Sequence, residues 1–159
     1  SSSKSFNLAG LQTSDIIIPS ASLRRKYRAQ LHRTGLGDPN IMGLVATEAA
    51  YRYGLPWLKE LREQLASNLE QVEAFFAQQL PGVILMSTQA TYMVWFNLQS
   101  YGVGAKKAER ALLEHGKVAL NPGYIFGAAG DDWMRINFAC PPNLLAEGLR
   151  RIKRGLDTL

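Results

Sequence analysis

The chain has 159 residues, of which 47% are hydrophobic and 19% are charged, and this composition is typical of a globular protein. No apolar run approaches the roughly 20 residues that a membrane-spanning helix needs, and Ser1–Gly10 do not have the pattern of a secretory signal. Cys140 is the only cysteine, which excludes an internal disulfide and favours a reducing, cytoplasmic location. The two histidines, His32 and His115, are too far apart in the sequence to indicate a metal site.

The formal net charge of +5 is concentrated in two basic stretches, Arg24–Arg33 and Arg150–Arg154. Basic patches can attract nucleic acid. Neither stretch is interleaved with aromatic residues in the way that single-strand binding proteins require. We therefore interpret both stretches as solvated helix faces and expect no nucleic-acid partner.

The first third of the chain predicts one strand and two helices. Asp15–Pro19 contains three consecutive isoleucines and ends at a proline, which indicates a short strand. A basic helix is expected over Ser22–His32, followed by a turn over Gly35–Pro39. Asn40 can cap the next helix, which Gly54 should end.

The strongest periodic pattern begins after Pro56, where apolar residues recur three or four positions apart until Pro81. This spacing predicts one amphipathic helix of about 24 residues. The remaining segments predict a compact α+β unit. Its expected strands are Val83–Met86, Thr91–Leu98, Lys117–Leu120 and Met134–Phe138, and its expected helices are Lys106–His115 and Leu144–Leu156.

These elements predict a boundary along the long helix, near residue 75. The piece before the helix is a poor domain by itself, because its single strand has no partner for its backbone groups. We therefore expect residues 1 to about 50 to complete a sheet whose other strands lie upstream.

Lys4 lies among serines and has no acidic neighbour in the sequence. A lysine amine can form a Schiff base if its surroundings lower its pKa. Taken alone, this segment favours a lysine in a polar surface loop.

The pattern Ser-x-Ser-Lys-x-Phe-x-x-x-Gly over residues 1–10 closely resembles the cofactor-lysine segment of class I/II aminotransferases, which are pyridoxal-phosphate enzymes. Four further segments look like that family, and in particular like its carbon–sulfur β-lyase branch, the cystathionine β-lyase-like enzymes. They are Leu55–Leu58, Thr91–Tyr92, Pro122–Gly127 and Met134–Pro141.

The resemblance implies the C-terminal portion of an α/β fold with a small α+β domain. Residues 1–50 would be the end of the large cofactor-binding domain, 51–80 the interdomain helix and 81–159 the small domain. The cofactor would be pyridoxal 5'-phosphate. Lys4 would bind it covalently and move the substrate Cα proton, Ser1 would contact its phosphate, and Arg135 would bind the substrate α-carboxylate.

Two departures from the family pattern bear on the reaction. Many aminotransferases have a basic residue eight positions after the lysine, where this chain has Gln12. Gln12 weakens a transaminase assignment and suits the lyase branch. In the family, a basic residue often follows the first proline of the carboxylate-binding segment, where this chain has Pro142 after Pro141. This second departure has no functional explanation. Tyr124 and Phe126 could approach the substrate from a loop on which Gly123 and Gly127 permit unusual backbone angles. For these two residues, and for Tyr92, Trp95 and Trp133, we favour packing over catalysis.

The implied function is β-elimination from a cysteine-type amino acid, giving a thiol, pyruvate and ammonia. Transamination is the nearest alternative, and a sensor domain of a transcription regulator is the second. The family also implies a homodimer. The portion seen here is expected to be inactive alone, because family residues that contact the cofactor lie upstream.

Overall fold

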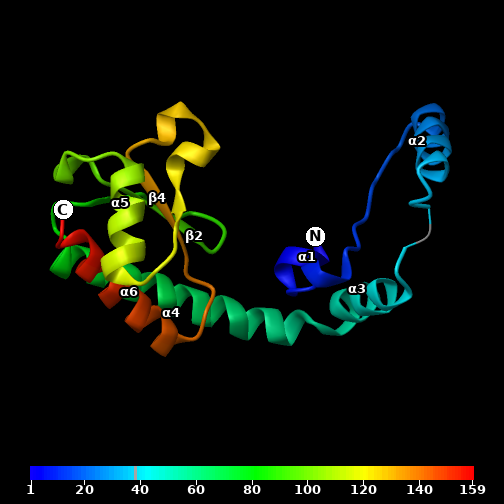
Figure 1. Cartoon of the computed structure of the whole chain (residues 1–159). Helices are drawn as coiled ribbons and strands as arrows, with labels where there is room; N and C mark the ends of the chain where they lie inside the picture. The colour runs from blue at the N-terminus through cyan, green and yellow to red at the C-terminus, as the bar shows by residue number, and fades with distance from the viewer. Residues whose placement is uncertain (38) are drawn as a thin grey trace. The chain divides into compact units, whose positions relative to one another are not determined.

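The computed structural model describes residues 1–37 and 39–159, and it divides into two compact units (Figure 1). Unit 1 is Ser1–Arg62 and unit 2 is Glu63–Leu159. The division falls inside the long helix α4, which spans Leu55–Gln79. No helix in the described part of the chain is long and apolar enough to cross a membrane.

Unit 1 is helical. Its elements before α4 are α1 (Ser2–Ser5), η1 (Ala9–Leu11), α2 (Ala21–Arg33) and α3 (Ile41–Tyr53). The basic helix and the helix between Asn40 and Gly54 were both predicted, and both are confirmed. Asn40 caps α3, since its Oδ1 accepts a hydrogen bond from the Met42 amide at 2.9 Å. The predicted turn over Gly35–Pro39 includes Asp38, which lies outside the described residues.

The predicted strand Asp15–Pro19 is wrong, because these residues form an irregular segment. Ile17 is 88% exposed. A strand needs a neighbour to receive its backbone hydrogen bonds, and the described residues of unit 1 contain no other strand. The Arg24 guanidinium instead donates a hydrogen bond to the Ile18 carbonyl oxygen at 2.7 Å. The three isoleucines therefore favour an extended backbone here, but the segment does not pair with a neighbouring strand.

The predicted long helix is confirmed, and α4 contains 25 residues. Its second residue is Pro56, which is favourable in the first helical turn because no intrahelical partner exists there for its missing N–H. It ends at Gln79, two residues before Pro81. Val72 and Phe76 on its second half are fully buried in unit 2.

Unit 2 is an α+β structure around a four-stranded antiparallel sheet with the strand order β1-β2-β4-β3. The strands are β1 (Ile84–Leu85), β2 (Met93–Asn97), β3 (Asn121–Pro122) and β4 (Trp133–Asn137). The helices are α5 (Ala105–Ala111), α6 (Pro142–Leu156) and the 3-10 turns η2 (Gln99–Tyr101), η4 (Gly123–Phe126) and η5 (Ala128–Gly130).

The two faces of this sheet have different environments because successive strand residues point to opposite sides. Val94 and Phe96 on β2, with Met134 and Ile136 on β4, are buried against the helices. The helical side of this core comprises Val72, Phe76, Leu80, Ala105, Ala108, Leu112, Leu145, Leu149, Ile152 and Leu156. Trp95 and Arg135 alternate with the core residues and occupy the opposite face.

The predicted strand Lys117–Leu120 is also wrong. The chain leaves α5 through a π-helical turn, Leu112–Gly116, and Lys117 has a left-handed backbone with φ of 55°. The Val118 amide donates a hydrogen bond back to the Leu112 carbonyl oxygen, and the Arg151 guanidinium donates to the Lys117 carbonyl oxygen. These interactions use backbone groups that a strand would need, so pairing with β4 begins only at Asn121.

Candidate functional site

The Lys4 segment is anchored to α3 by hydroxyl groups. Ser2 is buried, and its Oγ lies 3.1 Å from Thr47 Oγ1 on α3. The Ser3 hydroxyl donates a hydrogen bond to the Thr13 carbonyl oxygen at 3.2 Å. Lys4 directly follows these two serines in sequence, and its side chain is exposed. The segment therefore holds its backbone against α3 while leaving the lysine amine accessible in unit 1.

Two glycines of unit 1 allow this segment to approach α3 closely. A Cβ on Gly43 would collide with Thr13 Oγ1 and would lie 3.2 Å from the Leu11 carbonyl oxygen. A Cβ on Gly54 would lie 2.6 Å from the Phe6 ring. The Phe6 ring also packs against Tyr51 and Trp57, with ring centroids 5.9 and 6.1 Å apart. The sequence did not reveal this role of Gly43 and Gly54, because it depends on which loop packs on α3.

Ser1 and Lys4 belong to the same short helical turn. The Ser1 carbonyl oxygen accepts hydrogen bonds from the Lys4 and Ser5 amides, and the Ser1 hydroxyl makes no capping hydrogen bond within the helix. Among the described residues, Lys4 forms no ion pair with a carboxylate. Both predicted functional groups, a hydroxyl and an amine, are therefore exposed on one segment. Gln12 is also exposed and has a left-handed backbone, with φ of 51°.

Arg135 belongs to unit 2, in the middle of strand β4. Its Nη2 donates a hydrogen bond to Asn121 Oδ1 at 3.1 Å. Its guanidinium carbon lies 4.4 Å from the centre of the Phe126 ring and 5.7 Å from the centre of the Trp95 ring. Its Nε is buried and has no hydrogen-bond partner among the described residues. No carboxylate of the described residues forms an ion pair with Arg135, so its charge is available to an anion.

The segment Met134–Pro141, here called the Arg135 motif, is held near its end by a buried amide on α4. Asn68 is 1% exposed, and its Nδ2 donates hydrogen bonds to the carbonyl oxygens of Phe138 and Cys140, each at 2.9 Å. Buried polar groups are costly unless they are paired, so these bonds fix the path of the chain as it leaves β4. Burial also raises the pKa of the Cys140 thiol, which disfavours the reactive thiolate.

Tyr124 has a structural partner. Its hydroxyl donates a hydrogen bond to Glu109 Oε2 at 2.7 Å, and that bond is the main reason why the pKa of Tyr124 is raised. The Lys106 amine lies 5.5 Å from the centre of the Tyr124 ring. These contacts join the Gly123–Gly127 loop to α5. Gly123 packs directly on the backbone of Gly130, so the loop has no room for a Cβ at this position.

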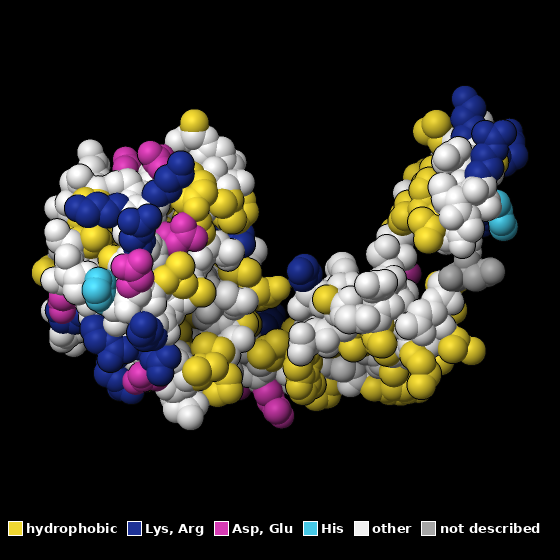
Figure 2. Space-filling model, in the orientation of Figure 1, with side chains coloured by type: hydrophobic (Ala, Val, Ile, Leu, Met, Phe, Trp, Pro, Cys, Tyr) yellow, Lys and Arg dark blue, Asp and Glu magenta, His cyan; other side chains and the backbone are white. Residues whose placement is uncertain are grey.

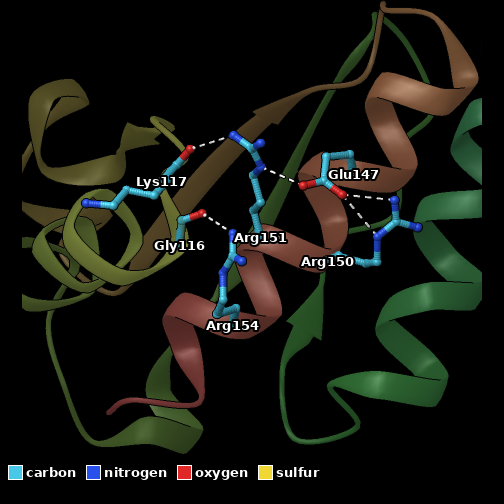
Figure 3. A network of polar contacts seen from close by, with 6 residues as sticks. All are labelled: Gly116, Lys117, Glu147, Arg150, Arg151 and Arg154. Carbon is cyan, nitrogen blue, oxygen red and sulfur yellow. Dashed lines mark hydrogen bonds and ion pairs between the residues drawn. The ribbon is translucent and has the colours of Figure 1, made fainter.

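The two basic stretches form visible patches over α2 and α6 (Figure 2). On α6 the cations have partners within the unit (Figure 3). Arg150 and Arg151 both pair with Glu147, at 2.9 and 2.8 Å, and these bonds, with Arg151 contributing most, lower the pKa of Glu147. Arg154 and Arg151 donate to the carbonyl oxygens of Gly116 and Lys117. Arg151 and Arg154 on α6 therefore bind the carbonyl oxygens at the end of the π-helical turn.

The described residues hold no group of three or more His, Cys, Asp or Glu side chains that could bind a metal ion. The two predicted cationic site residues are the exposed amine of Lys4 in unit 1 and the half-buried guanidinium of Arg135 in unit 2. An amine suits a covalent bond to a carbonyl carbon, and a guanidinium suits a carboxylate.

The comparisons with known proteins agree with this chemistry. The family model "Aminotransferase class I and II" matches residues 1–152. The chain therefore belongs to the aminotransferase class I and II family. Its fold is that of the C-terminal part of these pyridoxal-phosphate-dependent enzymes, as the sequence resemblance predicted.

Among curated relatives, the chain is 44% identical over 155 residues to the cystathionine β-lyase PatB of Bacillus subtilis, covering 98% of this chain and 40% of PatB. Among solved structures, it is similar to cystalysin of Treponema denticola, which contains pyridoxal 5'-phosphate. The TM-score is 0.93 at 27% identity, covering 99% of this chain and 40% of cystalysin.

A third similar protein is the pyridoxal-phosphate-bound C–S lyase of Staphylococcus hominis, with a TM-score of 0.85 at 30% identity. The match covers 98% of this chain and 40% of the lyase. The chain thus spans about 40% of the length of the proteins it matches.

Proposed function

We propose that this chain forms the C-terminal part of a pyridoxal-phosphate-dependent carbon–sulfur β-lyase that acts on sulfur-containing amino acids such as cystathionine. The observation that carries the proposal is the 44% identity to a cystathionine β-lyase over 98% of the chain. Within the chain, Lys4, Ser1 and Arg135 would carry the functional roles.

The exposed groups of the chain fit the chemistry of this cofactor. The Lys4 side chain is exposed on a segment whose neighbours Ser2 and Ser3 are anchored by hydrogen bonds. An amine in this setting can bond covalently to the cofactor carbonyl carbon, and the Ser1 hydroxyl can donate a hydrogen bond to the phosphate. The buried Nε of Arg135 lacks a partner among the described residues, which suits a site that receives a carboxylate oxygen.

Pyridoxal phosphate, when bound, supplies the electron sink that stabilises negative charge developing at the substrate Cα. Lys4 Nζ would take the Cα proton as a general base. Arg135 holds the α-carboxylate by a bidentate charge-assisted interaction and so fixes which Cα bond is broken. The Cβ–S bond then breaks and the thiolate leaves. Addition of water to the remaining carbon skeleton gives pyruvate and ammonia.

The experiment that tests this function uses a full-length enzyme that carries this chain as its C-terminal part. Cystathionine is added without any oxo acid, and pyruvate and free thiol are measured over time. A lyase releases both over many turnovers and returns its cofactor to the starting form. If pyruvate and thiol do not accumulate, the lyase proposal is wrong.

Transamination is the second candidate, because the family model that matches the chain is shared by aminotransferases. A transaminase would stop after one equivalent of amino acid and would resume only when an oxo acid is supplied.

The third possibility, a sensor domain of a transcription regulator, would require free basic patches. The partners of Arg150, Arg151 and Arg154 within unit 2 argue against that role for α6.

The domain assignment is part of the same proposal. Residues 1–50 would belong to the large cofactor-binding domain, 51–80 would connect the domains, and 81–159 would form the small domain. The core of unit 2 includes Val72, Phe76 and Leu80, so residues 81–159 pack together with the second half of the connecting helix. A homodimer and a cytoplasmic location stay predictions, and sedimentation of the full-length enzyme would measure the first.

A further inference from the structure

The guanidinium of Arg135 is enclosed by side chains from three separate segments of unit 2. Trp95 comes from β2, Asn121 from β3 and Phe126 from η4. In the sequence, these residues are 40, 14 and 9 positions before Arg135. Their convergence on one side chain is therefore a property of the fold.

The register of the sheet places two of these residues beside Arg135. Strand β4 lies between β2 and β3, and both Trp95 and Asn121 are the direct Cα partners of Arg135. Side chains directly opposite each other on antiparallel strands point to the same face of the sheet. Arg135 is thus the middle member of a cross-strand row, with an aromatic ring on one side and an amide on the other.

Phe126 completes the enclosure from a loop. Its ring lies 4.4 Å from the guanidinium carbon and packs edge-on against Trp95, with ring centroids 5.3 Å apart at 78°. An aromatic face attracts a cation, by about 0.5–1 kcal/mol where the pair is exposed. Phe126 is itself 53% exposed. The ring therefore covers the guanidinium on one side and faces solvent on the other.

The hydrogen-bond inventory of the guanidinium is incomplete. Asn121 Oδ1 accepts from Nη2, while the buried Nε has no partner in the described part of the chain. Leaving a buried donor unsatisfied costs about 1–3 kcal/mol. A planar carboxylate can accept two parallel N–H bonds from arginine, so a bound carboxylate can supply the missing acceptor.

We propose that Asn121, Trp95 and Phe126 form a positioning clamp that fixes the orientation of Arg135 for an α-carboxylate. Asn121 sets the rotation of the guanidinium through Nη2, and the Phe126 ring, supported edge-on by Trp95, limits its movement. The ligand class, an amino-acid carboxylate, rests on the proposed function, whereas the clamp itself rests on the geometry of unit 2. None of the three side chains reacts, so each is a positioning residue.

The clamp can be tested on the 159-residue chain without cofactor, by NMR of the arginine Nε–H signals during titration with acetate. The Arg135 signal is assigned as the one lost in Arg135→Lys. It should shift saturably with acetate and not with acetamide, which has a similar shape and no charge. A wild-type signal that acetate does not shift overturns the proposal.

Variants then separate the members of the clamp. Asn121→Ala removes the amide acceptor and should weaken acetate binding about two- to tenfold, the range for loss of one hydrogen bond. Phe126→Leu removes the aromatic face and should weaken it about two- to fivefold, whereas Phe126→Tyr keeps the ring and should bind as the wild type does. Ile125→Leu, on the same loop and equally exposed, is the matched control.

The amide spectrum of each variant shows whether unit 2 retains its fold. If Asn121→Ala disrupts it, the comparison of Phe126→Leu with Phe126→Tyr still decides. Equal acetate affinity in wild type, Phe126→Leu and Phe126→Tyr would overturn the clamp.

In the full-length enzyme, Phe126→Leu should raise KM for cystathionine more than it lowers kcat, with the cofactor absorbance unchanged. If acetate binding behaves as expected while that enzyme releases no pyruvate, the clamp stands and the proposed function fails.

Discussion

The lysine segment of unit 1 and the arginine strand of unit 2 are held by different kinds of interaction. In the described part of unit 1, only Ser2 and Gly43 are fully buried, and the Lys4 segment is held by hydroxyl hydrogen bonds and close backbone contacts with α3. Every buried hydrophobic side chain in the described residues lies in unit 2, where the neighbours of Arg135 on β4 are part of the core.

The two functional groups therefore depend on different parts of the sequence. Arg135 is positioned by a sheet whose other face carries a continuous apolar core, so changes to that core should act on the whole unit. Lys4 is positioned by a few local contacts, so single changes at those contacts should act locally.

The largest expected effect is on the core of unit 2. Phe96 is fully buried, and its ring centre lies 5.2 Å from that of Phe76 on α4. Phe96→Ala should lower the free energy of unfolding by about 3–5 kcal/mol, because it removes a large apolar side chain and leaves a cavity. Urea unfolding of the chain measures this value. Ile17→Ala in unit 1 is the control, since an exposed side chain should change the value by less than about 0.5 kcal/mol.

A second change removes the amide that links α4 to the end of the Arg135 motif. Asn68→Ala leaves the carbonyl oxygens of Phe138 and Cys140 without their donor and should destabilise unit 2 by about 1–3 kcal/mol. Urea unfolding is again the measurement, and Asn143→Ala on the exposed start of α6 is the matched control. Equal stabilities of the two variants would show that the buried amide contributes nothing.

The α+β character of unit 2, the long helix and the Asn40 cap could be predicted from the sequence, because apolar periodicity and capping residues act locally. The predicted strand Asp15–Pro19 was wrong because the described part of unit 1 offers it no partner strand. The predicted strand Lys117–Leu120 was wrong because the Val118 amide and the Lys117 carbonyl oxygen are bonded to Leu112 and Arg151 instead. Lys4, Ser1 and Arg135 were singled out by their motifs. The convergence of Asn121, Trp95 and Phe126 on Arg135 could not be predicted, since it depends on sheet register and loop path.

A third change tests the local support of Lys4. Gly43→Ala places a methyl group against the Thr13 hydroxyl and should displace the segment from Leu11 to Thr13. The cost of overpacking, about 1–3 kcal/mol, is partly offset by the gain of roughly 1 kcal/mol in helix propensity. Hydrogen exchange of the residue 1–13 amides should become faster, while that of β4 stays unchanged. Gly10→Ala is the control, because a Cβ there meets open space.

The smallest expected effect concerns the surface of α6. The hydrogen bonds from Arg151 and Arg150 lower the folded-state pKa of Glu147. Its contribution to stability is therefore present above its unfolded pKa, and it is lost as pH falls through the folded pKa. Glu147→Gln should lower Tm slightly at pH 7 and not at pH 2.5, with the difference reduced by salt. Equal Tm differences at both pH values would contradict the assignment.

The central claim is that Lys4 carries the cofactor. The full-length enzyme, loaded with pyridoxal phosphate, is reduced with borohydride to fix the cofactor–lysine bond and is then digested for mass spectrometry. The added pyridoxyl mass should appear on the peptide that contains Lys4, and Lys4→Ala should show no visible cofactor absorbance. Finding that mass on another lysine, such as Lys106 or Lys117, with Lys4 unmodified would contradict it.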